Sequence, residues 1–176
     1  MDSNSLQTAE GLGVLHLFCK IPEQLFHKKK GKLFRAIETA RASSMQVVTV
    51  SILGHKADVA FMVLSNDWAQ LRSFQTAVAA SGLEIVDSYV SLTEISEYAQ
   101  GVPEEMRNAR LYPELPPDDK KAWCFYPMSK RRNPTQNWFT LPFEKRKELM
   151  YEHGASGRKF SGRVLQVITG STGVDD

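Results

Sequence analysis

The chain has 176 residues, 42% of them hydrophobic and 24% charged, which suffices for one ordinary domain or one and a half small ones. Its longest apolar runs are too short to cross a bilayer, and residues 1–11 lack the apolar core of a signal peptide, so we expect no membrane span. The two cysteines, Cys19 and Cys124, lie far apart and form no metal-binding pair. This cysteine usage favours a reducing compartment and predicts a cytoplasmic location.

Charge is distributed unevenly along the sequence. The net charge is only +2, yet residues 120–163 contain eleven lysines and arginines against three glutamates. A basic segment of this kind implies an anionic partner, and nucleic acid, a phosphate ester and a polycarboxylate all qualify.

Residues 1–10 are expected to be a tail, and residues 11–96 to form a complete domain. Hydrophobic periodicity predicts strands at 11–20, 46–53, 59–64 and 83–95, with helices at 33–42 and from about 67 to Gly82. The order strand, helix, strand, strand, helix, strand is typical of a ferredoxin-like α+β fold. His16 is interpreted as a core histidine. The basic run 27–32 is interpreted as a solvated loop, with a phosphate-binding patch as the alternative.

Residues 97–119 are predicted to be an irregular linker, because Gly101 and four prolines interrupt regular structure over most of it. The linker contains Arg110. This arginine suits either a surface salt bridge or a clamp for a carboxylate at the mouth of a site.

Residues 120–176 predict only the first half of a second ferredoxin-like unit. A strand at 123–130 is followed by a helix from about Thr140 to His153, where Gly154 is expected to end it, and then by a strand at 163–169.

Two parts of this second unit carry candidate chemistry. In a strand, Tyr126, Met128 and Lys130 would point to one face, and a phenol, a thioether and an ammonium suit a pocket for a flat, partly anionic ligand better than a core. His153 would lie at the end of an apolar helix face. No second ligand stands at zinc spacing, so a single histidine suits haem iron, although a helix-terminal histidine also often interacts with the helix dipole.

The sequence resembles the chlorite dismutase-like haem proteins, and within them the coproheme decarboxylases of bacterial haem synthesis. The resemblance spans most of the chain. It is carried by 15–18 (LHLF), 109–113 (ARLYP), 126–132 (YPMSKRR), 137–138 (NW), 153–160 (HGxxGRKF) and 169–173 (TGSTG).

This resemblance implies a fold of two ferredoxin-like units, usually assembled as a homopentamer, with the porphyrin in the second unit. Members continue past Asp176, so residues 120–176 would be the first half of that unit. The implied reaction uses hydrogen peroxide to decarboxylate two propionates of iron coproporphyrin III, giving haem b. The iron porphyrin serves as both substrate and redox cofactor, and no nucleic-acid partner is expected.

Residue roles follow from the same resemblance. Tyr126 matches the redox-active tyrosine, Lys130 the lysine beside the reacting propionate, and His153 the proximal iron ligand. Gln166 stands where chlorite-degrading members have an arginine, which favours the decarboxylase. Further substrate-binding residues would be Arg110, Met128 and Trp138.

Two other functions remain open at this point. One is chlorite or peroxide breakdown by a haem protein of the same family. The other is a non-catalytic module that binds porphyrin, or nucleic acid, through its basic half.

Overall fold

The computed structural model describes residues 6–26, 31–99 and 101–175. They divide into two compact units. The sheet unit comprises Met1–Ile95, Val102–Pro117 and Val167–Asp176, and the hairpin unit comprises Ser96–Gly101 and Asp118–Gln166. The basic run His27–Lys30, and with it the predicted loop or phosphate patch, lies outside the described residues.

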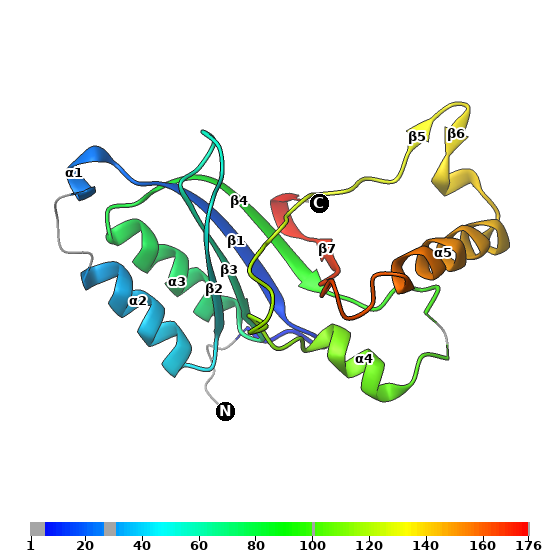
Figure 1. Ribbon diagram of the computed structural model, residues 1–176, viewed down its shortest axis with the longest axis horizontal. Coiled ribbons are helices and arrows are strands. Elements are labelled where there is room, and N and C mark those ends of the chain that lie inside the picture. The colour runs from blue at the N-terminus through cyan, green and yellow to red at the C-terminus, as the bar shows by residue number, and fades with distance from the viewer. Residues whose placement is uncertain (1–5, 27–30, 100, 176) are drawn as a thin grey trace. The chain divides into compact units, whose positions relative to one another are not determined.

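The sheet unit is built on one antiparallel sheet with the strand order β2-β3-β1-β4-β7 (Figure 1). Helices α2 and α3 cover one face of it, and the short helix α1 follows β1. The order of the first four strands, with one helix between β1 and β2 and another between β3 and β4, is ferredoxin-like. The predicted α+β class is thereby confirmed. The element bounds are β1 Gly13–Lys20, α1 Glu23–Phe26, α2 Gly31–Ala42, β2 Gln46–Ser51, β3 Val59–Ser65, α3 Trp68–Ala80, β4 Glu84–Thr93 and β7 Thr169–Ser171.

The core of the sheet unit lies between the sheet and these two helices. Alternate residues of β1, Leu15, Leu17 and Cys19, belong to one buried cluster with side chains of α2, α3 and β3. Within it, the rings of Phe61 and Phe74 meet edge to face with centroids 5.8 Å apart. The apolar residues that recur at strand and helix spacing therefore pack into one continuous buried layer.

His16 is a buried histidine, as the sequence predicts. It pairs in register with Met62 on β3 and Tyr89 on β4, and its relative exposure is 4%. Burial lowers the pKa of its imidazole to about 4, against an opposing contribution from a hydrogen bond with the Tyr89 backbone.

The ends of α3 follow the expected chemistry. The Asp67 side chain caps the helix by accepting a hydrogen bond from the Ala69 amide at 2.8 Å. Past the other end, Gly82 adopts a positive φ of 94°, which a glycine adopts without the steric cost that a Cβ would bring.

The linker contains a helix that the prolines were expected to prevent. Helix α4 occupies Glu104–Leu111 because Pro103 and Pro113 bracket a proline-free run of good helix formers. Its C-terminal end is tied to β4, since Thr93 Oγ1 donates to the Leu111 carbonyl at 2.8 Å. The expectation of irregular structure over most of the linker holds for its described residues outside these eight.

The hairpin unit differs from the expected half-sheet. Residues 123–130 form no strand, which corrects that prediction; Pro127 removes one ladder donor and no described strand pairs with the segment. The unit instead contains a two-residue ladder between β5 (Arg132–Asn133) and β6 (Gln136–Asn137), a 3-10 turn (Trp138–Thr140), and helix α5 (Phe143–Arg158).

Helix α5 also continues where it was expected to stop. Gly154 and Gly157 are helical, and the positive φ that ends such a helix appears later, at Gly162 with 76°. A glycine permits this termination but does not require it. The added turn places His153 inside the helix and not at its end.

The last predicted strand, 163–169, is mostly absent. Only Thr169–Ser171 forms a strand, β7, which pairs with β4 through Ser91, Leu92 and Thr93. A short 3-10 turn follows at Gly173–Asp175, where Asp175 Oδ2 accepts a hydrogen bond from the Val90 amide at 2.8 Å. Strand β7 thus adds a fifth strand at the β4 edge of the sheet. The domain limits 11–96, 97–119 and 120–176 stay predictions.

Among the helices that the structure describes, none has the length and apolar character needed to cross a membrane.

Candidate functional site

Lys130 is the best-placed of the predicted site residues. Its Nζ lies 4.4 Å from the centroid of the Trp138 ring, and 3.9 Å from the Met150 sulfur on α5. An ammonium over an indole face is attracted by the negative face of the ring, and a thioether is a weak acceptor. The hairpin and α5 thus fix the direction of a long, flexible side chain.

Trp138 is itself packed into an aromatic cluster of the hairpin unit. The Tyr98 ring meets it edge to face at 6.1 Å, and Tyr98 stacks on Phe143 at 5.4 Å. Arg146 lies over Tyr98 and forms an ion pair with Glu97 at 3.4 Å. Tyr98 is 9% exposed, and its burial raises the pKa of the phenol.

Helix α5 connects this cluster to His153. Phe143, Arg146, Met150 and His153 are spaced three, four and three residues apart, which places them on one stripe of the helix. His153 is exposed. The imidazole therefore lies one turn beyond the methionine that contacts Lys130.

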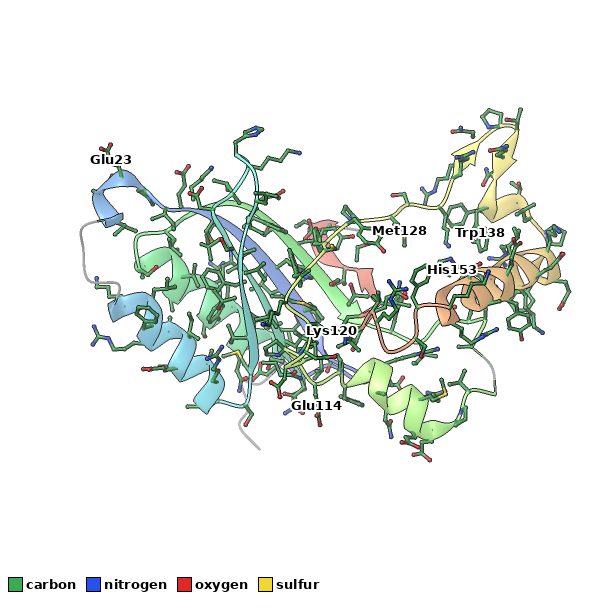
Figure 2. All side chains as sticks on the ribbon, viewed as in Figure 1. Glu23, Glu114, Lys120, Met128, Trp138 and His153 are labelled. Carbon is green, nitrogen blue, oxygen red and sulfur yellow. The ribbon has the colours of Figure 1, made fainter. Side chains whose placement is uncertain are left out.

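Tyr126 and Met128 lie in the extended segment that was predicted to be a strand. Their exposures are 61% and 75%, so both side chains are open to a ligand. Nearby, the rings of Trp123 and Phe125 stack 5.8 Å apart with 8° between their planes, so alternate residues share a side there even without a sheet. Figure 2 labels Met128, Trp138 and His153, which come from the segment, the hairpin turn and the helix of this unit.

The structure brings together only some of the predicted site residues. In the described part of the hairpin unit, no hydrogen bond or ring contact joins Tyr126, Met128 or Gln166 to the Lys130 cluster. Gln166 is exposed and outside any strand, which corrects its expected place on a strand face. Arg110 is exposed in the last turn of α4 and belongs to the sheet unit.

Sequence reasoning missed Met150 and Tyr98. Met150 carries a usable signal, because it precedes His153 by three residues on the same helix stripe. Tyr98 carries none, since it lies in the linker, far along the chain from the segment it supports.

Two open hollows of the surface do not gather the predicted site residues. One of about 660 Å³ lies between α2 and α3 and is lined by none of them. A smaller one of about 410 Å³ lies at the hairpin, where Trp138 is the only predicted site residue in its lining. Neither hollow by itself gives the outline of a site.

The donor set fits a metal that arrives inside a porphyrin. Among the described residues, no group of three or more His, Cys, Asp or Glu side chains is placed to hold a bare metal ion. A porphyrin supplies four nitrogens and needs only one axial protein ligand, and the exposed imidazole of His153 is a candidate for that place. Lys130 adds a cation that suits the propionates at the porphyrin edge.

Comparison with known proteins places the chain in a family. Residues 27–176 match the family described as chlorite dismutase. A coproheme decarboxylase from Staphylococcus carnosus is 46% identical over 138 residues, a match that covers 72% of this chain and 54% of that protein. The chain thus spans about half the length of this relative.

Solved structures agree with this placement. A heme-binding protein from Thermus thermophilus is 28% identical, with a TM-score of 0.78, covering 97% of this chain and 75% of that one. Chlorite dismutase from Candidatus Nitrospira defluvii has a TM-score of 0.63 at 17% identity, covering 96% and 74%, and shows a shared fold. From the match over residues 27–176, the chain belongs to the chlorite dismutase family.

Proposed function

We propose that this protein is a coproheme decarboxylase, which converts iron coproporphyrin III to haem b with hydrogen peroxide. The observation that carries the proposal is the 46% identity to a protein of that name. The contact of Lys130 with Trp138 and Met150, one helical turn from His153, supports it, because it places a cation on the helix face that carries the axial ligand candidate.

The proposed reaction balances with one peroxide for each propionate. A propionate, one peroxide and one proton give a vinyl group, carbon dioxide and two waters. The propionate loses two electrons, and the O–O bond accepts them as it breaks. The bound iron porphyrin supplies the route for those electrons.

Tyr126 takes the hydrogen in this scheme. Its phenol loses one electron and one proton, and the resulting phenoxyl oxygen removes a hydrogen atom from the propionate carbon next to the macrocycle. The C–C bond to the carboxylate then breaks, carbon dioxide leaves, and a second electron is lost as the double bond forms. The exposure of Tyr126 leaves its oxygen open to a propionate.

Lys130 holds the carboxylate and supplies or accepts a proton in its neighbourhood. His153 would hold the iron as its single protein ligand. The remaining substrate-binding residues are Met128, Trp138, Gln166 and Arg110, of which Arg110 pairs with a further propionate.

The direct test adds peroxide to the protein with iron coproporphyrin and identifies the tetrapyrrole by mass spectrometry. The proposal expects a product that has lost two carboxyl groups, together with the intermediate that has lost one. Unchanged coproporphyrin would refute it. Oxygen release from chlorite at an enzymatic rate would instead indicate the chlorite dismutase reaction, which Gln166 in place of an arginine disfavours.

His153 can be tested as the ligand separately from turnover. His153→Ala is expected to bind iron coproporphyrin with an altered absorption spectrum, because the axial nitrogen is lost, and added imidazole is expected to restore the spectrum. The exposed Tyr151→Ala on the same helix is the matched control. An unaltered spectrum in His153→Ala would remove this residue as the ligand.

The proposal includes the surroundings in which this reaction would take place. Cys19 and Cys124 are both free thiols, which supports a reducing, cytoplasmic location. Assembly as a homo-oligomer, a pentamer by the family resemblance, is checked by light scattering of the purified protein.

A further inference from the structure

The Lys130 ammonium is held by two groups that come from different elements. Trp138 presents its ring face at 4.4 Å from the 3-10 turn, and Met150 presents its sulfur at 3.9 Å from α5. A free lysine on an exposed segment samples many rotamers. Two simultaneous contacts select those rotamers in which the ammonium lies over the indole and beside the helix.

The Trp138 ring also contacts a second aromatic side chain, Tyr98. Tyr98 meets Trp138 with 84° between the ring planes, and Phe143 stacks on Tyr98 with 23°. Arg146 lies 5.8 Å from the Tyr98 centroid and ties Glu97 to α5 through its ion pair. An edge-to-face contact defines the direction of both rings, so Tyr98 sets the orientation of the face that Lys130 contacts.

The same helix stripe carries both the clamp and the iron-ligand candidate. Phe143, Arg146, Met150 and His153 follow one another at helical spacing. A shift of Met150 or Phe143 would therefore change where the ammonium lies relative to His153.

We infer that Trp138 and Met150 are positioning residues, which hold the Lys130 ammonium toward the α5 stripe that carries His153, and that Tyr98 orients Trp138 for this purpose. The inference rests on the proposed function, in which this ammonium meets a propionate. It assigns Met150 and Tyr98 a part in the site that the sequence analysis did not predict. Fixing the cation before the substrate arrives removes an ordering cost from the reaction.

The clamp is measurable without porphyrin, by NMR of the full chain with lysines labelled at the ε-carbon. The Lys130 signal is assigned as the one missing from Lys130→Arg. Protons above an aromatic face are shielded, so the Lys130 ε-protons are expected upfield of the other lysines.

Trp138→Leu is expected to abolish this upfield shift, and Trp138→Phe to retain part of it. Met150→Leu, which conserves volume, is expected to reduce it because the second contact is lost. Trp123→Leu removes another indole of the same unit and is expected to leave the shift unchanged. A Lys130 signal at the ordinary lysine position, or one that Trp138→Leu does not move, would overturn the inference.

Tyr98 gives an independent test by rescue. Tyr98→Leu is expected to reduce the Lys130 shift, and Tyr98→Phe to keep most of it, because phenylalanine retains the ring that meets the indole edge to face. If Tyr98→Leu unfolds, which circular dichroism reports, Met150→Leu decides the question. Equal shifts in the leucine and phenylalanine variants would contradict the role of Tyr98.

Kinetics separate this inference from the function on which it rests. In decarboxylation assays, Met150→Leu is expected to lower kcat several-fold with KM unchanged, since a mispositioned cation affects the reacting complex more than binding. An unchanged kcat would contradict the positioning role. If the unsubstituted protein produces no haem b, the proposed function fails, whereas the NMR shift still decides whether the clamp exists.

Discussion

At the scale of single residues, burial shifts the pKa of two titratable groups on β1. His16 lies inside the sheet with a pKa lowered to about 4, and Cys19 on the same strand has a thiol pKa raised to about 11 by burial. Both shifts favour the neutral form in the folded chain. The sequence predicts the burial of His16 from its two leucine neighbours. The sequence does not show which side chains contact the Lys130 ammonium, because Trp138 and Met150 are brought to it by tertiary structure.

His16 predicts a pH dependence of stability. Its imidazole takes up a proton near pH 6.5 when unfolded but only near pH 4 when folded, so the unfolded state binds more protons between these values. The free energy of unfolding is therefore expected to fall as pH drops from about 6.5 to 4, by up to about 3 kcal/mol from this group. Urea denaturation across this range measures it.

His16→Phe is the matched variant, since it keeps a buried ring and removes the titration. Its unfolding free energy is expected to change less with pH over the same window. The Asp58 carboxyl, whose pKa is lowered first by a hydrogen bond from the Ile21 amide, loses its contribution only at lower pH. Parallel pH profiles for the two proteins would show that His16 does not titrate as described.

At the scale of elements, the hydrophobic period predicted secondary structure well where a segment packs against other elements of the sheet unit. The helices α2 and α3 and the strands β1 to β4 follow it closely, because each buries its apolar face within the sheet unit. It was a poor guide at residues 123–130 and 163–168, where alternation exists but no adjacent strand is present in the described residues. A strand needs a ladder partner, and local sequence cannot supply one.

Helix ends illustrate the same limit. Pro103 and Pro113 were correctly noticed as breakers, but the run between them is long enough for α4. Gly154 was expected to stop α5, although a glycine inside a helix costs only about 1 kcal/mol relative to alanine, an amount that other helix contacts can offset. Local propensity is thus too weak to set these ends.

Thr93 offers a test of how α4 is held. Thr93 is 2% exposed, and its hydroxyl accepts from the Leu12 amide at 2.7 Å and donates to the Leu111 carbonyl at 2.8 Å. Thr93→Val keeps the shape but leaves both backbone groups unpaired, so we expect the free energy of unfolding to fall by about 1–3 kcal/mol.

Thr93→Ser retains the hydroxyl and is expected to lose less stability than the valine variant. Chemical denaturation of the three proteins measures both changes. A valine variant as stable as the unsubstituted chain would mean that these hydrogen bonds do not anchor α4.

At the scale of the whole molecule, composition and motif gave different kinds of information. The basic segment 120–163 predicted an anionic partner but could not choose among nucleic acid, phosphate esters and polycarboxylates. The motifs around Tyr126, Trp138 and His153 led to the family, and the match over residues 27–176 confirms it. The contacts among the candidate site residues depend on tertiary structure, and the contacts of Lys130 with Trp138 and Met150 are an example.

The most direct measurement compares the unsubstituted chain with Tyr126→Phe, each supplied with iron coproporphyrin III and peroxide. Tetrapyrrole products are quantified by mass spectrometry and porphyrin binding by absorption. We predict that both proteins bind the porphyrin and that only the unsubstituted chain forms haem b. Each propionate that is converted to a vinyl group is expected to consume one peroxide. Equal haem b formation by Tyr126→Phe, or none by the unsubstituted chain with porphyrin bound, would contradict the proposed radical decarboxylation.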